Sequence, residues 1–124
     1  MRKPSPTLTP QELEIMKAVW ARGQATVRDV YEDLLAGRKV AYTTVMTMMN
    51  VLERKGHLRK RAQGRSFLYR PTRPQSQVVG TMVRDFVRRV FGGSAQPLLV
   101  HLVEEHDLSR EELDALVRRI EKKR

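Results

Sequence analysis

The chain has 124 residues, enough for one domain or for a small domain with an extension. Its 24 lysine and arginine residues outnumber 14 aspartate and glutamate residues, and the net charge of +10 at pH 7 favours a polyanionic partner, nucleic acid first and an anionic membrane surface second. The absence of cysteine excludes disulfides, thiolate metal sites and a cysteine nucleophile.

The N-terminal segment and the hydropathy of the chain indicate a cytoplasmic protein. Residues 1–7 carry charge without a following apolar run, so we expect a flexible tail and no signal peptide. No stretch approaches the length of a membrane span, and we expect no insertion into a membrane.

Two capping boxes predict the first two helices. A Thr-Pro-Gln-Glu run begins at Thr9, where threonine caps the helix, proline takes the first helical position and glutamate closes the box. A second box begins at Thr26 and closes three residues later at Asp29. Gly23 and Gly37 are the expected ends of the two helices.

The third helix is expected to begin between Ala41 and Thr43 and to end at Lys55. Apolar residues at the spacing i, i+3, i+4, i+7 predict its buried stripe, which consists of Val45, Met48, Met49 and Leu52. The opposite side, which we name the reading face, is predicted to contact base edges in the major groove of double-stranded DNA. Its residues are Tyr42, Thr43, Thr44, Met46, Thr47 and Asn50.

The side chains of the reading face suit base contacts. Threonine hydroxyls form hydrogen bonds, Met46 and the threonine methyl groups can touch thymine methyls, and Asn50 can pair bidentately with adenine. The alternative is an amphipathic core helix with a solvent-exposed face. Tyr42 and Met46 at exposed positions argue against that alternative.

After the third helix, the apolar pattern changes to that of strands. Leu58–Arg61 and Ser66–Arg70 are predicted to form a hairpin, the wing, with Ala62–Arg65 as its turn and Gly64 at a positive φ. The alternative is a charged edge strand that blocks aggregation. The cations predicted to contact DNA phosphates are Arg54, Lys55, Arg59, Lys60, Arg61 and Arg65.

The remaining sequence predicts three helices, over 75–91, over 95–104 and after a third capping box that begins at Ser109. These helices carry more apolar residues than a short winged domain can bury, so we expect a second copy of the chain to cover them. The residues predicted to hold the dimer are Val79, Met82, Phe86, Val90, Leu99, Leu102, Leu113, Leu116 and Ile120.

Taken in order, these elements predict a mostly α-helical chain with a small β-wing. A winged helix-turn-helix is expected over residues 8–73 and a helical dimerisation domain over residues 74–124. A homodimer with two-fold symmetry fits inverted half-sites in DNA.

The sequence offers little to catalysis or metal binding. His57, His101 and His106 lack the spacing of metal ligands, and no base lies at motif distance from a serine. We therefore expect no enzyme, no metal site and no cofactor.

The motifs gathered above resemble the penicillinase-repressor family, the BlaI/MecI type. The resemblance covers nearly the whole chain from Leu8 onward, and its most specific run is Tyr-Thr-Thr-Val-Met-Thr, which begins at Tyr42. The segments that carry it are Leu8–Met16, Trp20, Ala25–Val30, Ala41–Thr47, Leu52–Gly56, Tyr69–Pro71, Val103–Glu105 and Asp107–Ser109.

This resemblance implies a bacterial dimeric repressor that binds inverted repeats in promoters, often those of β-lactam-resistance genes and of its own operon. In the best-known members a membrane sensor-protease triggers cleavage between an asparagine and a phenylalanine. The matching positions are His101 and Leu102, so this chain carries a different dipeptide at the implied cleavage position. The copper-responsive branch has a C-terminal cysteine cluster, and this chain has no cysteine.

Three interpretations of the basic winged chain stay open at this point. The first is a sequence-specific repressor, and the second is a basic architectural protein that binds nucleic acid without base specificity. The third is a winged-helix interaction module whose charge is incidental. Excess random DNA separates the first two, because only a specific repressor keeps its operator under that competition.

Overall fold

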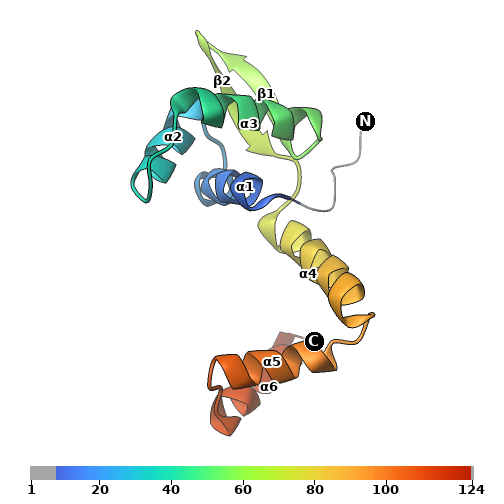
Figure 1. The fold of residues 1–124 in the computed structure, drawn as a ribbon. Coiled ribbons are helices and arrows are strands. Elements are labelled where there is room, and N and C mark those ends of the chain that lie inside the picture. Colours follow the sequence, from blue (N-terminus) through green and yellow to red (C-terminus); the bar gives the residue numbers. More distant parts are fainter. Residues whose placement is uncertain (1–7, 124) are drawn as a thin grey trace. The chain divides into compact units, whose positions relative to one another are not determined.

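The computed structural model describes residues 8–123, and the flexible tail expected over residues 1–7 lies outside them. The predicted fold, mostly helical with a two-stranded wing, is confirmed (Figure 1). No helix in the described part of the chain has both the length and the apolar character that crossing a membrane requires. The elements are α1 (Pro10–Arg22), α2 (Val27–Leu35), α3 (Tyr42–Arg54), β1 (Leu58–Gln63), β2 (Ser66–Pro71), α4 (Gln75–Phe91), α5 (Gln96–Glu105) and α6 (Arg110–Lys123).

The first two helices begin where the capping boxes predict. In α1 the Thr9 hydroxyl accepts a hydrogen bond from the Glu12 amide at 3.1 Å, and the Glu12 carboxylate accepts one from the Thr9 amide at 2.9 Å. Thr26 and Asp29 form the same pair of bonds at the start of α2. Helix α3 has no side-chain cap at Ala41, so packing of its buried stripe holds this helix in place.

The strands of the wing are longer than predicted, and the loop that joins them is shorter. The strands pair antiparallel up to Gln63 opposite Ser66, so the loop contains only Gly64 and Arg65. This corrects the expected four-residue turn. Gly64 has φ 61° at the first loop position, the pattern of a type II′ turn, whose twist matches that of the paired strands. Arg65 therefore lies at the tip of the wing.

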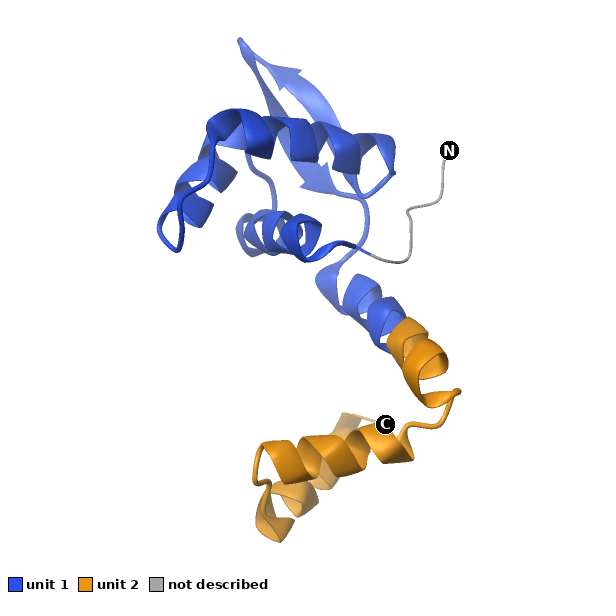
Figure 2. Cartoon of the chain, in the orientation of Figure 1, with its two compact units in different colours: residues 1–83 blue, residues 84–124 orange. Residues whose placement is uncertain are grey.

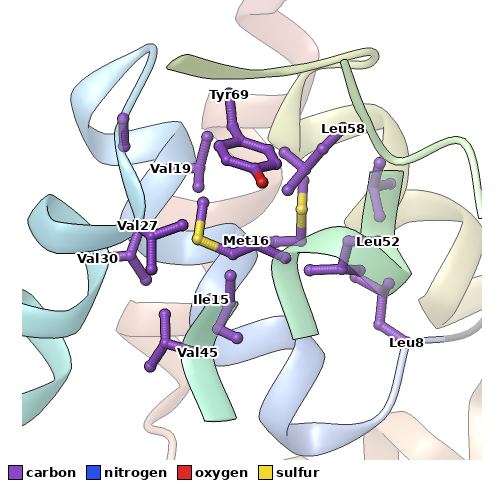
Figure 3. Close-up of a cluster of buried hydrophobic side chains, with 13 residues drawn as sticks. Leu8, Ile15, Met16, Val19, Val27, Val30, Val45, Leu52, Leu58 and Tyr69 are labelled. Carbon is purple, nitrogen blue, oxygen red and sulfur yellow. The ribbon is translucent and has the colours of Figure 1, made fainter. Parts of the chain in front are cut away.

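A single hydrophobic core joins α1, α2, α3 and the wing (Figure 3). Tyr69 brings β2 into this core, and its backbone exchanges two hydrogen bonds with Ala25 at 2.8 and 2.9 Å. In the predicted α3 stripe, Met48 is only partly buried while the other three members are buried. The buried side chains of the core are Leu8, Ile15, Met16, Val19, Ala25, Val27, Val30, Val45, Met49, Leu52, Leu58, Tyr69 and Val78.

The chain forms two compact units, and the first continues beyond the expected boundary at residue 73. Residues up to Val83 form unit 1, and residues from Arg84 form unit 2 (Figure 2). Val78 of α4 is buried in the core of unit 1, and Met82 packs against that core. The first half of α4 thus completes the winged domain. Met82, predicted to hold the dimer, is used within its own chain.

Unit 2 contains the second half of α4 together with α5 and α6. Within residues 84–123 no hydrophobic side chain is among the buried ones. Phe91 contacts Phe86 and His101, with ring centroids 5.8 and 6.0 Å apart. The predicted third capping box is present, since Ser109 and Glu112 exchange two hydrogen bonds of 3.1 Å.

Candidate nucleic-acid interface

The reading face and the wing border a common cleft in unit 1. The cleft has a volume of about 430 Å³ and also takes in the start of α2. The charged side chains that line it are those of Arg28, Lys60 and Arg65, and no aspartate or glutamate is among the lining residues. The cleft therefore has a positive potential suited to a phosphate backbone. Its lining residues are Thr26, Val27, Arg28, Tyr42, Met46, Asn50, Lys60, Arg65, Ser66, Phe67 and Tyr69.

Helix α3 contributes three of the predicted base-reading residues to the cleft. Tyr42, Met46 and Asn50 follow one another at four-residue spacing and so share one side of the helix. Tyr42 and Met46 are 38% and 39% exposed, as the reading-face prediction requires. The other three members, Thr43, Thr44 and Thr47, are exposed on α3 without lining the cleft. The three threonines present hydroxyl and methyl groups at the surface of α3, and Thr44 also lines a separate cavity beside α1 and α2.

Asn50 makes contacts that the sequence did not indicate. Its Oδ1 accepts a hydrogen bond from the Tyr69 hydroxyl at 2.9 Å and another from the Lys60 ammonium at 3.1 Å. Bidentate pairing with adenine requires both the amide oxygen and the amide nitrogen. Because the oxygen already accepts two bonds, the arrangement seen here does not offer the predicted adenine contact. Asn50 instead joins α3 to the wing.

Tyr69 is suited to donate to this bond. Burial raises the pKa of the Tyr69 hydroxyl, and the negative charge of Glu53 raises it further. The hydroxyl consequently keeps its proton across the neutral pH range and acts as the donor toward Asn50.

The predicted wing cations divide into two groups. Arg61 and Arg65 are exposed, with Arg61 on β1 and Arg65 at the tip of the wing, and their contact with phosphates stays a prediction. Lys60 lies 4.7 Å from the centre of the Phe67 ring and also bonds to Asn50. Its ammonium group therefore links β1 to Phe67 on β2 and to Asn50 on α3. Arg54 and Arg59 are exposed at the end of α3 and on β1.

Lys55 also has a structural contact where a phosphate contact was predicted. Its Nζ lies 2.7 Å from Oε2 of Glu12, whose side chain is buried. Burial opposes ionisation of Glu12, but the hydrogen bonds from Lys55 and Thr9 and the positive charge of Lys55 prevail and lower its pKa. This ion pair fastens the end of α3 to the start of α1, which orients the reading face on the core.

Arg28 is a site residue that sequence reasoning missed. It lines the cleft, and its guanidinium lies 5.4 Å from the centre of the Tyr42 ring. Tyr31 packs edge-on against the same ring at 5.5 Å. The sequence did contain an indication of this role, because a cation in the first turn of α2 interacts unfavourably with the helix dipole. A bound anion in the cleft would compensate for that unfavourable placement.

The described residues contain no group of three or more His, Asp or Glu side chains that could hold a metal ion. The predicted cleavage position lies within α5, where His101 and Leu102 are both exposed. Of the predicted dimer residues in unit 2, Leu113 is partly buried and the others are exposed, Phe86, Leu102 and Leu116 by between 41% and 43%.

Comparison with known proteins identifies relatives over most of the chain. The penicillinase repressor family model matches residues 8–122. The penicillinase repressor of Bacillus licheniformis is 28% identical, over 96% of this chain and 93% of that protein. The transcriptional regulator BlaI of Mycobacterium tuberculosis is 38% identical, over 86% of this chain and 78% of that protein.

Two solved structures resemble the winged domain. The solution structure of the DNA-binding domain of the repressor BlaI is 32% identical with a TM-score of 0.54, covering 61% of this chain and 92% of that one. The Bacillus licheniformis BlaI monomer, solved in complex with the blaP half-operator, is 30% identical with a TM-score of 0.51 over the same shares. The chain therefore belongs to the penicillinase repressor family, as its motifs indicated, and is a DNA-binding winged-helix transcriptional repressor, not an enzyme.

Proposed function

We propose that the protein represses transcription as a homodimer that recognises an inverted-repeat operator. The observation that carries this proposal is the cleft of unit 1, where the exposed side of α3 adjoins cations from α2 and the wing. The complex of the similar Bacillus licheniformis BlaI monomer with a half-operator supports one winged domain per half-site.

The distribution of charge between the two units supports DNA binding by unit 1. Residues 1–83 carry 15 lysines and arginines against 6 aspartates and glutamates, a net charge of +9. Residues 84–124 carry 9 against 8, a net charge of +1. Unit 1 is thus the half that attracts a polyanion, while unit 2 is nearly neutral and rich in exposed apolar groups.

Unit 2 supplies the proposed dimer contact. A monomer that exposes this many large apolar side chains on three short helices is unusual, and a second copy would cover them. Two winged domains related by a two-fold axis then face inverted half-sites. The exposed apolar residues that support this contact are Phe86, Val90, Leu99, Val100, Leu102, Leu116, Val117 and Ile120.

We extend the proposal to regulation in the cytoplasm by a membrane sensor-protease, with β-lactam-resistance genes and the repressor's own operon as targets. Membership of the family supports this extension. The implied cleavage position, His101–Leu102, lies inside α5, so a protease would have to unwind that helix to reach the bond. Cutting an engineered protease site at this position should release operator DNA; unchanged affinity in the cut protein would refute the coupling.

Selection of bound sequences from a random DNA pool tests the repressor proposal. We expect the full chain to enrich two inverted half-sites whose centres lie about one helical turn of DNA, or a multiple of it, apart. Enrichment without any preferred sequence would instead indicate the architectural alternative.

A further inference from the structure

We infer that Asn50 is a specificity-determining residue whose amide is held in one orientation by the wing, so that it offers only N–H donors to DNA and selects a base edge made of acceptors, guanine first. This inference rests on the proposed function and concerns one position in each half-site. It replaces the adenine contact that the residue type alone suggested.

The identity of the neighbours fixes the direction of the amide. The side chain of Lys60 carries only donors, so the atom of Asn50 that lies 3.1 Å from its Nζ must be the acceptor, Oδ1. The Tyr69 hydroxyl donates to the same oxygen at 2.9 Å. Turning the amide over would place its NH₂ group against the Lys60 ammonium, where two donors would face each other.

The amide nitrogen is then the group that Asn50 can offer to a molecule in the cleft. Among residues 8–123, the hydrogen bonds of this side chain all end on Oδ1. Asn50 lines the cleft together with Met46 and Tyr42, which lie one and two helical turns earlier, respectively, on the same side of α3. A base edge that enters the cleft beside Met46 therefore meets the two hydrogens of Nδ2.

The pattern of groups in the major groove decides which base fits. Guanine presents two acceptors, O6 and N7, whereas adenine presents one acceptor beside the N6 amino donor and cytosine presents the N4 amino donor. A side chain limited to donors favours guanine, tolerates the O4 acceptor of thymine and disfavours adenine and cytosine.

The experiment is selection from a random DNA pool with the full chain and with the Asn50→Asp variant. The aspartate keeps an oxygen for Lys60 and Tyr69, but its other oxygen accepts hydrogen bonds where the amide donated them. We expect the unaltered protein to select an inverted repeat with guanine or thymine at one position of each half-site. Asn50→Asp should select the same repeat with cytosine at that position, by about ten-fold over guanine.

Two further variants separate orientation from contact. Lys60→Met removes the group that fixes the amide, and the preference for guanine over adenine at that position should fall from about ten-fold to less than about three-fold. Asn50→Ala should leave that position without a preferred base while the rest of the repeat stays selected. Urea unfolding of each variant should remain cooperative, as in the unaltered protein.

The outcomes are distinct. A repeat that both the unaltered protein and Asn50→Asp select with the same base at every position would overturn this inference and leave the proposed function standing. Selection of adenine by the unaltered protein at the position that Asn50→Ala relaxes would overturn it as well. A pool without any preferred sequence would overturn the proposed function and this inference together.

Discussion

Glu12 shows how a single residue orients the reading face. Its Oε1 closes the capping box of α1, and its Oε2 accepts from Lys55 at the end of α3. Glu12 as a whole residue is only 4% exposed, so both carboxylate oxygens need these partners. A residue whose type indicates a helix cap thus also links the end of the DNA-reading helix to α1.

Glu12→Gln should weaken the fold in a pH-dependent way. Glutamine keeps the capping box but loses the ionic bond, and we expect the free energy of unfolding at pH 7 to fall by about 1 kcal/mol, since Lys55 is partly open to solvent. The pKa of Glu12 is lower in the folded chain than its ordinary value near 4.5. Its contribution is therefore present above that value and is lost as the pH falls through the folded pKa.

Urea unfolding of both proteins between pH 7 and pH 3 measures this contribution. The difference between the unaltered protein and Glu12→Gln should shrink below about pH 4.5. Glu14→Gln is the matched control, because Glu14 lies two residues away with an exposed ion pair to Arg38. A difference that stays constant down to pH 3, or an equal loss in the control, would contradict the role given to Glu12.

At the scale of the elements, the wing depends on the backbone of its tip. Gly64 has a positive φ of 61°, which a side chain with Cβ adopts only with strain. A Cβ at this position would meet no atom within 4 Å, so steric overlap with the rest of the chain adds nothing. Any loss of stability on substitution then comes from the turn itself.

We expect Gly64→Ala to lower the free energy of unfolding by about 1 kcal/mol. Gly37→Ala is the control: its φ lies outside the positive range, its nearest neighbour would be the Leu34 carbonyl at 3.8 Å, and its effect should be neutral or stabilising. Thermal unfolding of the two variants compares them directly. Equal loss at both glycines would argue against the tight turn.

Arg65 at the tip should supply affinity without sequence preference. Arg65→Ala should weaken binding to operator and to random DNA alike and reduce the slope of log K against log salt by about one. Lys17→Ala removes an exposed cation on α1 outside the cleft and should change neither. Fluorescence anisotropy titrations at several salt concentrations provide the slopes. An unchanged slope in Arg65→Ala would show that the tip of the wing does not contact DNA phosphates.

Local signals predicted the elements, and tertiary contacts determined what the sequence could not show. The boxes at Thr9 and Thr26 predicted two helix starts, because a cap involves residues only three apart. The bond between Asn50 and Tyr69 crosses 19 positions and two kinds of element, so no spacing could indicate it. Val78 was not predicted because the first part of α4 packs on unit 1 while the rest belongs to unit 2. The apolar pattern of the exposed second half concealed the one residue that the first turn buries.

At the scale of the whole molecule, the division into two units predicts separable functions. A chain that ends at Val83 keeps the complete core of unit 1, including Val78, and lacks the apolar surface of unit 2. We expect light scattering at micromolar concentration to give a monomer for this fragment and a dimer for the full chain. Circular dichroism should show that the fragment is folded, and a monomeric full chain would refute the dimer.

Dimerisation should matter because it links two modest contacts. When one winged domain binds its half-site, the second contact becomes nearly intramolecular and benefits from a high effective concentration. The full chain should therefore gain far more from a complete inverted repeat than the fragment ending at Val83 does.

The measurement that tests the central claim most directly is competition for the selected inverted repeat, with the full chain bound and random DNA added in excess. The account predicts that the repeat is held at least about a thousand-fold more tightly than random DNA, and that a single half-site falls between the two. Release of the repeat by random DNA in proportion to its amount would contradict sequence-specific repression and identify a basic architectural protein instead.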